Sequence, residues 1–248
     1  MALKSVRVDE VIYLSPTDRL FVLTGAGISA ESGIPTFRDA NGLWEGWRFE
    51  EVASPEAWAR DPNLVWKFYS MRRQGALPCK PNPAHIALAE IERQIGDRFF
   101  LCTQNVDNLH EQAGSRRLVH MHGELFKSRC DSCSRSPFPD ENTYGVPAPC
   151  HCGGRIRPHI VWFGEMPFEM ERIMSEIERC TVMAVIGTSG VVHPAASFVH
   201  WARQKYPSGG VPVRTIYIGP EEPANHSAFD QCFFGRAGEI LPGLFHSE

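Results

Sequence analysis

The chain has 248 residues, of which 43% are hydrophobic and 22% charged, and its formal net charge is −4. This composition is typical of a soluble globular protein, and it excludes binding of nucleic acids or anionic membranes through a strongly basic surface. No apolar run approaches the roughly 18 residues of a membrane-spanning helix. Residues 1–10 contain no apolar signal core, so we expect a cytoplasmic protein.

The first predicted strand, Leu20–Thr24, runs directly into a glycine-rich segment with the sequence GAGISAESGIPTFR over residues 25–38. Residues 1–19 are expected to form a helix and a lead-in to this strand. Because Gly25 and Gly27 lack a Cβ atom, the backbone can turn sharply there and approach a ligand closely.

The continuation of this segment departs from an ordinary dinucleotide-binding motif. The amides of residues 28–31 can begin a helix whose positive end faces a pyrophosphate, and Ala30 stands where the third glycine is usual. Pro35 then disfavours helical geometry almost at once. The turn-rich residues 38–44, which end at Trp44, are interpreted as a flap over a cofactor or as a plain surface loop.

Two helix starts are visible in the next part of the chain. Asp61-Pro62 and Asn82-Pro83 each place a capping residue before a proline, which suits the first helical position. They predict helices over residues 63–74 and 83–91. Residues 36–84 therefore read as a mostly helical insertion between the first two strands of a Rossmann-like sheet.

Further apolar runs predict strands that alternate with helices, which indicates an α/β fold with a doubly wound parallel sheet. These strands are expected at residues 98–103, 118–122, 160–163, 183–186 and 213–218. Ligands bind at the carboxyl ends of such strands. Polar or small residues stand there in three places, namely Gln104, Asn105 and Asp107, then His120 and His122 on one strand face, then Gly187, Thr188 and Ser189.

Four of the eight cysteines form a compact motif. Cys130 and Cys133 are separated by two residues, Cys150 and Cys152 by one, and 16 residues lie between the pairs. Four thiolates suit one tetrahedral zinc ion in a closed structural site. One residue separates the second pair, whereas two residues are the commoner spacing. His151 in place of one cysteine and a pair of disulfides are the less favoured alternatives, the latter because residues 1–10 contain no apolar signal core.

Taken together, these segments resemble the sirtuins, which are NAD-dependent protein deacylases. The motifs occur in the family's order over most of the chain, at residues 25–38, 103–107, 120–123, 130–152, 157–165, 187–189 and 237–242. The resemblance implies a discontinuous Rossmann-like domain of residues 1–35, 85–125 and 156–248. It also implies a small domain made of the helical insertion 36–84 and the zinc module 126–155.

The resemblance further implies NAD as cosubstrate, one structural zinc ion, and His122 as general base. In the family the acyl oxygen attacks the ribose carbon that bears nicotinamide, and the base then activates a ribose hydroxyl. Water completes the reaction to free lysine and O-acyl-ADP-ribose. A histidine suits proton removal at neutral pH, whereas His120 is expected to be structural.

By the same resemblance, a larger set of residues binds the cofactor. It comprises Gly25, Ala26, Gly27, Ile28, Ala30, Glu31, Pro35, Thr36, Phe37, Arg38, Trp44, Gln104, Asn105, Val106, Asp107, Gly187, Thr188, Ser189 and Ala237. For Asn105 and Asp107, helix capping is an equally suitable role. The asparagine that the family often carries after a later strand is absent, since Gly219-Pro220 follows Ile218.

The resemblance also places the substrate. The peptide lies as an added strand between residues 163–165 and 191–192. The substrate-binding set comprises Ala53, Tyr69, Arg72, Val161, Phe163, Gly164 and Glu165. Tyr69 and Arg72 lie three residues apart on one helix face and resemble the signature of sirtuins that remove acidic acyl groups. The alternative is that Tyr69 packs in the core and Arg72 pairs with a surface acid.

The sequence therefore predicts an enzyme that removes succinyl, malonyl and also acetyl groups from lysine in proteins or peptides. An NAD-dependent protein ADP-ribosyltransferase and a noncatalytic NAD or ADP-ribose sensor are the alternatives. We expect no nucleic-acid partner, no membrane association and a monomer.

Overall fold

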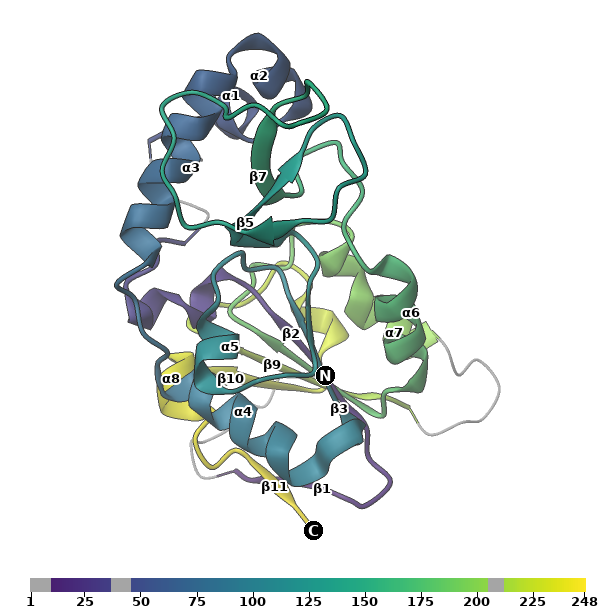
Figure 1. Ribbon diagram of the computed structural model, residues 1–248. Helices are drawn as coiled ribbons and strands as arrows, with labels where there is room; N and C mark the ends of the chain where they lie inside the picture. The colour runs from purple at the N-terminus through teal and green to yellow at the C-terminus, as the bar shows by residue number, and fades with distance from the viewer. Residues whose placement is uncertain (1–9, 37–45, 205–211) are drawn as a thin grey trace.

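A parallel six-stranded sheet forms the centre of the larger part of the molecule (Figure 1). The computed structural model describes residues 10–36, 46–204 and 212–248. The sheet order is β10, β9, β8, β2, β3, β4, and every neighbouring pair is parallel. The strands are β2 (Leu20–Thr24), β3 (Phe99–Thr103), β4 (Leu118–His120), β8 (Val182–Ile186), β9 (Arg214–Gly219) and β10 (Gln231–Phe234). This is the strand order of dinucleotide-binding folds, so the predicted doubly wound α/β fold is confirmed.

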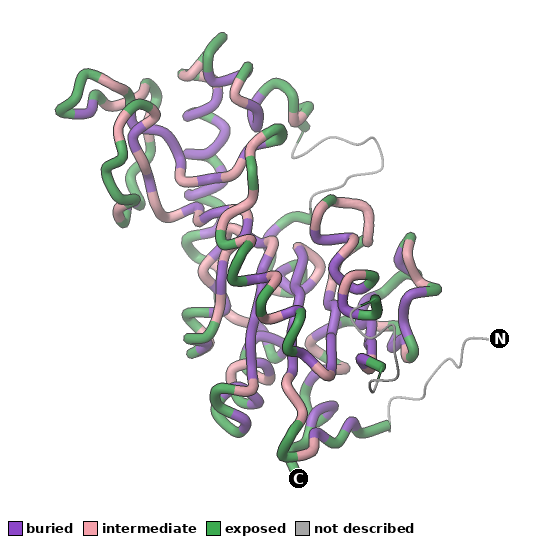
Figure 2. The backbone as a smooth tube through the Cα atoms, turned by 90° about the vertical axis from the view of Figure 1, so that its right-hand side faces the viewer, coloured by how far each residue is buried: buried purple, intermediate pink, exposed green. Residues whose placement is uncertain are grey.

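Helices cover both faces of this sheet, which explains why its strands are continuous apolar runs. On β2, Leu20 and Val22 belong to a core that includes residues of α4 and α8, whereas Phe21 and Leu23 belong to the opposite core with α6 and α7. The covering helices are α4 (Pro83–Ile95), α6 (Met170–Arg179), α7 (Phe198–Gln204) and α8 (Ala237–Ile240). β2, β3 and β8 are buried along their whole lengths. Figure 2 shows buried stretches of the chain running through the interior of the molecule, with exposed stretches around them.

A second, smaller unit lies above the carboxyl ends of these strands (Figure 1). It combines a three-stranded antiparallel sheet with three helices around a separate core that contains Trp66, Tyr69 and Trp162. Its elements are α1 (Phe49–Val52), α2 (Pro55–Arg60), α3 (Pro62–Ala76), β5 (Gly123–Cys130), β6 (Phe138–Pro139) and β7 (Ile156–Ile160).

The prediction that residues 160–163 continue the large sheet is wrong. The strand there is β7, over Ile156–Ile160, and it pairs antiparallel with β5 in the smaller unit. Gly123 explains the change of sheet, because it has a φ of +87° at the start of β5. A Cβ at that position would collide with the carbonyl oxygen of His159. The chain therefore leaves the large sheet at Gly123 and pairs with β7 instead.

The predicted helix starts are confirmed. The side chains of Asp61 and Asn82 accept hydrogen bonds from the amides of Leu64 and Ala84 at the starts of α3 and α4. Both helices run beyond the predicted ends, and α3 continues through Gly75.

The helix predicted before the first strand is wrong for residues 10–19, which contain the strand β1 (Ile12–Leu14). Its burial alternates from residue to residue, as in a half-exposed strand, and it pairs with β11 (Phe245–Ser247). The remaining elements are α5 (Leu109–Ala113) and the 3-10 turns η1 (Ala26–Ile28), η2 (Ala30–Ser32), η3 (Gly96–Arg98), η4 (Ala195–Ser197) and η5 (His226–Ala228).

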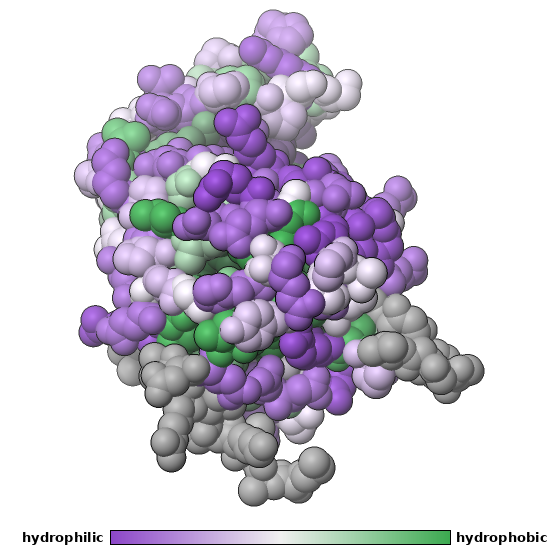
Figure 3. All heavy atoms as spheres, turned by 90° about the horizontal axis from the view of Figure 1, so that it is seen from below, coloured by the Kyte–Doolittle hydropathy of each residue, from purple (hydrophilic) through white to green (hydrophobic). Residues whose placement is uncertain are grey.

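The end of the molecule opposite the smaller unit carries mostly hydrophilic residues, with apolar side chains in small separate groups (Figure 3). Among the described residues, no helix is long and apolar enough to cross a membrane.

Candidate active site

Two glycine-containing loops meet where the strand order of the large sheet reverses. Gly25 and Gly27 follow β2, and Gly187 follows β8. A Cβ on Gly25 would lie 2.8 Å from the Gly187 carbonyl oxygen, and one on Gly27 would lie 2.7 Å from the Gly187 Cα. The Gly27 amide donates to the same carbonyl over 2.8 Å. The sequence suggested a close approach to a ligand, whereas the structure shows that these glycines first permit contact between the two loops.

The glycine-rich segment forms two 3-10 turns rather than the start of one helix. Within the first turn, the amides of Ile28 and Ser29 donate to the carbonyl oxygens of Gly25 and Ala26 over 3.1 Å. The helix expected to begin at residues 28–31 is therefore replaced by two short turns, and the pyrophosphate contact stays a prediction. The Ile28 side chain lies fully buried in the core of the large sheet.

Glu31 fastens the second turn, which begins at Ala30, to the end of the chain. Its carboxylate accepts a hydrogen bond of 2.8 Å from the amide of Gly238, directly after Ala237 in α8. The two predicted cofactor residues Glu31 and Ala237 thus lie side by side, and the Glu31 carboxylate is used to join their segments. Phe37, Arg38 and Trp44 lie outside the described residues.

The loop after β3 is tied to the glycine-rich segment by side chains. The Asn105 Nδ2 donates to the Gly25 carbonyl oxygen and to the Ser29 hydroxyl, each over 3.1 Å. The Ser29 hydroxyl in turn donates to Asp107 Oδ2 over 3.1 Å. Gln104 reaches the third loop, since its Nε2 donates to the Thr188 hydroxyl over 3.3 Å. The predicted cofactor residues from three strand ends therefore form one connected network.

Asp107 makes the helix-capping contact that its sequence position allowed, and its role toward the cofactor stays a prediction. Its Oδ1 accepts from the Leu109 amide over 3.1 Å, which caps α5. Burial raises the pKa of the Asp107 carboxyl, although hydrogen bonds from the Leu109 amide and the Ser29 hydroxyl oppose this shift. A buried carboxyl group of this kind is a suitable acceptor for a neutral amide ligand.

His122 is arranged as a neutral base. Its Nδ1 lies 3.1 Å from the carbonyl oxygen of Gln104. Because a carbonyl can only accept, Nδ1 carries the hydrogen, and Nε2 of the neutral ring carries the lone pair. Burial lowers the pKa of His122 below its usual value, so the ring is neutral at pH 7. β4 ends at His120, so His122 lies in the following turn and not on the strand face that the sequence predicted.

His120 has the opposite environment. Its Nδ1 lies 2.9 Å from the Asn105 carbonyl oxygen, and its Nε2 lies 2.7 Å from Glu111 Oε1. Burial lowers the pKa of His120, but the hydrogen bond and charge of Glu111 outweigh it, and the pKa is raised. Both ring nitrogens of His120 face acceptors, whereas no bond from the described residues reaches Nε2 of His122, so of these two histidines His122 is the one suited to act as a base.

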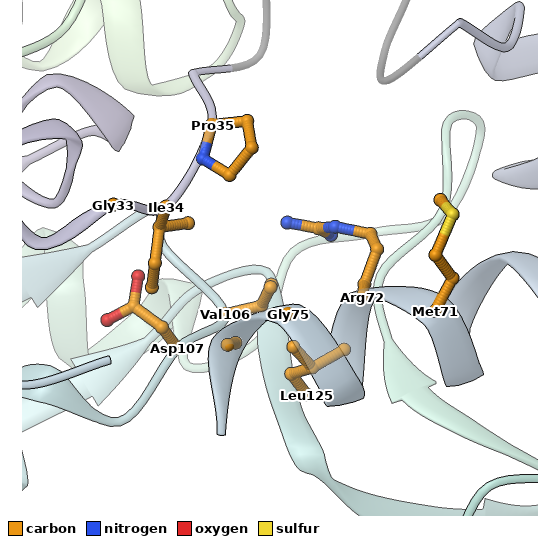
Figure 4. Close-up of a pocket in the computed structure, with 10 residues that line it drawn as sticks. Gly33, Ile34, Pro35, Met71, Arg72, Gly75, Val106, Asp107 and Leu125 are labelled. Carbon is orange, nitrogen blue, oxygen red and sulfur yellow. The ribbon is translucent and has the colours of Figure 1, made fainter. Parts of the chain in front are cut away.

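A cavity of about 160 Å³ lies between the large sheet and the smaller unit. Arg72 from α3 and Asp107 from the loop after β3 approach it from opposite sides, and the Arg72 guanidinium points across it toward Ile34 and Pro35 (Figure 4). The lining residues are Gly33, Ile34, Pro35, Met71, Arg72, Gly75, Ala76, Val106, Asp107 and Leu125. One predicted acyl-binding residue and three predicted cofactor residues, Pro35, Val106 and Asp107, therefore line the same cavity.

Tyr69 is fully buried in the core of the smaller unit, as the packing alternative foresaw, and it is not among the residues that line the cavity. Its hydroxyl accepts a hydrogen bond of 3.1 Å from the Trp162 indole. Burial raises the pKa of Tyr69 to about 12, so the hydroxyl is neutral. Arg72 is also buried, with 8% of its surface exposed, and it lines the cavity rather than the outer surface.

The loop after β7 links His122 to the smaller unit through backbone hydrogen bonds. The Val161 amide donates to the His122 carbonyl oxygen over 2.9 Å, and the Phe163 amide donates to the Ala53 carbonyl oxygen over 3.1 Å. Phe163 is 40% exposed, and Gly164 follows it with a φ of +92°.

The partly exposed Glu165 carboxylate is held by hydrogen bonds within the protein, and its predicted contact with the substrate stays a prediction. It accepts from the Trp162 amide and from Arg157, over 2.8 Å and 2.7 Å. The side chain thereby holds the loop in shape.

The four cysteines of the smaller unit bring their sulfur atoms close together. All four Sγ atoms lie within 4.8 Å of one another, with Cys130 and Cys152 3.5 Å apart and Cys133 and Cys150 3.9 Å apart. A zinc ion about 2.3 Å from each sulfur would require sulfur–sulfur distances of about 3.8 Å. These distances exclude the two disulfides, which would need about 2.05 Å. The cluster fits one structural zinc ion.

Backbone amides support this cluster. The amides of Ser132 and Cys133 donate to the Cys130 sulfur, and both bonds lower the pKa of that thiol. The Gly154 amide donates to the Cys152 sulfur. His151 lies beside the cluster, with its Nδ1 3.4 Å from the Cys150 sulfur, and is not one of the four.

Sequence reasoning missed three residues of the site. Ser29 joins Asn105 to Asp107, Leu125 lines the cavity, and Arg73 contacts the strand that carries Leu125. The position of Ser29 inside the glycine-rich segment was a usable signal. No local pattern marks Leu125 or Arg73.

The fold and site define an α/β dinucleotide-binding protein with an attached four-cysteine unit. Residues 25–194 match the model of the Sir2 family. A curated NAD-dependent protein deacylase from Shewanella oneidensis is 48% identical over 231 residues, which cover 91% of this chain and 92% of that protein. The one from Vibrio cholerae is 45% identical over 234 residues and 92% of each chain. The chain belongs to the Sir2 family.

Solved structures agree with this assignment. A Sir2 homologue in complex with NAD has a TM-score of 0.81 and 44% identity, over 96% of this chain and 89% of that one. A Sir2 protein bound to a myristoylated histone peptide has a TM-score of 0.69 and 32% identity, over 91% and 88%.

Proposed function

We propose that this Sir2 family member is an NAD-dependent protein-lysine deacylase that prefers succinyl and malonyl groups and also removes acetyl groups. This proposal rests on a cavity that both Arg72 and Asp107 line. The first residue offers a cationic fork for an acyl carboxylate, and the second offers an acceptor for the nicotinamide carboxamide. The acyl group and the nicotinamide of NAD can then bind next to each other in one cavity.

The residues at the strand ends fit NAD. Asp107 is a buried acceptor that lines the cavity, and Ile34 and Val106 contribute apolar walls to it. NAD, when bound, supplies the ribose carbon that takes the acyl oxygen and the hydroxyl that is deprotonated. The Asn105 Nδ2 is occupied by Gly25 and Ser29, so we infer that Asn105 acts by holding these loops in place.

His122 removes the proton in this proposal. The Gln104 carbonyl fixes its tautomer and leaves Nε2 as the basic atom, while burial keeps the ring neutral at pH 7. The hydrogen bond from Val161 to the His122 carbonyl holds the backbone of the base. The products are nicotinamide, free lysine and O-acyl-ADP-ribose.

The substrate is inferred to be an acyl-lysine in a protein or peptide. It would lie as an extended strand beside residues 163–165, where Phe163 offers an exposed aromatic side chain. Ala53 holds this edge through its bond to the Phe163 amide. A relative of this fold has been solved with an acylated histone peptide, which supports this class of substrate.

We further infer two functional domains and a cytoplasmic, monomeric enzyme without nucleic-acid partners. The large domain carries the chemistry, and the helical insertion with the zinc module forms the small one. Because β7 pairs with β5, the boundary proposed at residue 156 is moved to the end of β7 at Ile160. None of the eight cysteines forms a disulfide, which fits a reducing compartment.

Product analysis tests this function. The protein would be incubated with NAD and one peptide bearing succinyl-, malonyl- or acetyl-lysine, and the products identified by mass spectrometry. We expect free lysine peptide and O-acyl-ADP-ribose, fastest for the acidic acyl groups. ADP-ribosylated protein without acyl loss would favour the transferase, and binding without turnover would favour the sensor.

A further inference from the structure

Arg73, the neighbour of Arg72 on α3, is a buried cation with several acceptors. Its side chain is 1% exposed. Its Nε donates to the Leu125 carbonyl oxygen over 2.8 Å, and its two terminal nitrogens donate to the carbonyl oxygens of Asn142 and Lys127 over 2.6 Å and 3.1 Å. The guanidinium also lies 3.3 Å from Asp140. Arg73 therefore joins α3 to β5 and to the segment between the two cysteine pairs.

The hydrogen bond from Arg73 to the Leu125 carbonyl oxygen links these contacts of Arg73 to the cavity. Leu125 lines the cavity, and its own amide donates to the Val106 carbonyl oxygen over 2.7 Å. Val106 precedes Asp107 and lines the cavity as well. Through the backbone of one residue, two hydrogen bonds therefore link the wall on α3, the wall on β5 and the loop after β3.

The side chains of Arg72 and Arg73 point in different directions because the two residues are consecutive on a helix. Consecutive side chains project about 100° apart. Arg72 points across the cavity (Figure 4), whereas Arg73 points into the smaller unit and contacts β5. The contacts of Arg73 fix both the rotation and the height of this turn of α3, and thus the position from which the Arg72 side chain starts.

We propose that Arg73 is a positioning residue that sets the distance between Arg72 and the Asp107 end of the cavity, and thereby selects the length of the acidic acyl chain. This inference rests on the proposed deacylase function. When α3 is held rigidly, the acyl chain that reacts best is the one whose length brings its carboxylate to Arg72 while the acyl oxygen remains at the reaction centre. A neutral, short acetyl group does not reach Arg72 and is insensitive to that distance.

The test is Arg73→Lys, measured with malonyl-, succinyl-, glutaryl- and acetyl-lysine forms of one peptide. Lysine keeps the charge beside Asp140 but cannot make all the bonds of the planar fork. We expect kcat/KM for succinyl-lysine to fall about tenfold, mainly through KM, while that for acetyl-lysine stays within about threefold. The ratios among the three acidic substrates should become flatter.

Arg98→Lys is the matched control. Arg98 also clamps backbone carbonyls, those of Ser15 and Asp18 over 2.8 Å and 3.1 Å, but it lies next to the start of β3, away from the cavity. It should leave all four substrate ratios unchanged. Equal losses for every substrate in Arg73→Lys, or no loss for any, would overturn the proposal.

The parent protein is measured first, so that the two claims can fail separately. A parent without preference for acidic acyl groups refutes the proposed specificity, and this inference with it. A parent with that preference, but an Arg73→Lys variant with unchanged ratios, refutes the inference alone. If Arg73→Lys does not fold, as judged by melting and zinc content, Asp140→Asn replaces it. That variant keeps Arg73 and should show a selective loss of about threefold for succinyl-lysine, and its absence would count against the proposal.

Discussion

The two ends of the cavity are built in different ways. At the Asp107 end, short loops that directly follow β2, β3 and β8 hold one another through glycine contacts and the bonds of Asn105 and Ser29. At the Arg72 end, the wall is a helix of the smaller unit that is fixed by contacts with distant strands and with the cysteine module. Changes at the first end should therefore affect every substrate, and changes at the second end should distinguish among acyl groups.

The largest effect is expected at the first end, from His122→Ala. Loss of the neutral Nε2 base should reduce turnover of succinyl- and acetyl-lysine alike by about 10²–10⁴-fold. Steady-state kinetics with both peptides measures the loss, and calorimetric titration checks that NAD still binds. A variant within a few-fold of the parent would show that another group is the base.

Removal of zinc tests whether the cysteine module stabilises the Arg72 end of the cavity. Cys130→Ala removes one of four ligands, and a structural zinc site contributes directly to folding free energy. We expect less than one zinc per chain by elemental analysis and a lower melting temperature. One equivalent of metal retained in the variant without all four cysteines would contradict the assignment.

Arg72→Met should separate the two ends most clearly. A hydrogen bond to a charged group contributes about 1.5–3 kcal/mol, so kcat/KM for succinyl-lysine should fall by roughly one to two decades. Acetyl-lysine turnover should remain near the parental value or rise. Equal losses on both substrates would make Arg72 a purely structural residue.

The pH dependence should follow His122. Its pKa is lowered by burial, and the base is active when deprotonated, so activity is present above that pKa and is lost as the pH falls through it. The acid limb of kcat/KM for acetyl-lysine should therefore lie below about pH 6.5. A midpoint clearly above that value would contradict a neutral, buried base.

The smallest effect is expected from Glu111→Gln, which removes the partner of His120. The pKa of His120 is raised, so its contribution to stability is complete below the unfolded-state pKa and is lost as the pH rises through the folded one. The Glu111 side chain is 37% exposed, so screening limits the loss to about 0.5 kcal/mol near pH 6. Chemical denaturation at pH 6 and pH 9 measures it, and a loss that grows with pH would reverse the assigned sign.

The sequence predicted the Asp107 end of the cavity better than the Arg72 end, because the patterns that mark the Asp107 end are local in the sequence. Strand ends, glycines and polar residues after apolar runs placed residues 25–35, 104–107 and 187–189 at one edge of the sheet. The reason for Gly25 and Gly27 was missed because their contact, Gly187, lies about 160 residues away along the chain.

The second end depends on pairings that no short pattern reveals. The apolar run at residues 160–163 does not show which sheet it joins, and only the pairing of β7 with β5 decides this. Likewise, helix spacing put Tyr69 and Arg72 on one face, but only packing shows that Tyr69 is enclosed by the core while Arg72 lines the cavity. Only the position of Leu125 in the fold shows that Arg73, and not Arg72, bonds to β5.

The proposed function requires that one cavity holds the acyl carboxylate at Arg72 and nicotinamide at Asp107. A crystal structure of the protein with NAD and a slowly reacting thiosuccinyl-lysine peptide would show whether it does. We expect a carboxylate oxygen about 2.7–3.2 Å from the Arg72 guanidinium, with the carboxamide of nicotinamide at a similar distance from Asp107. A succinyl group that points away from α3, or nicotinamide bound outside the cavity, would contradict it.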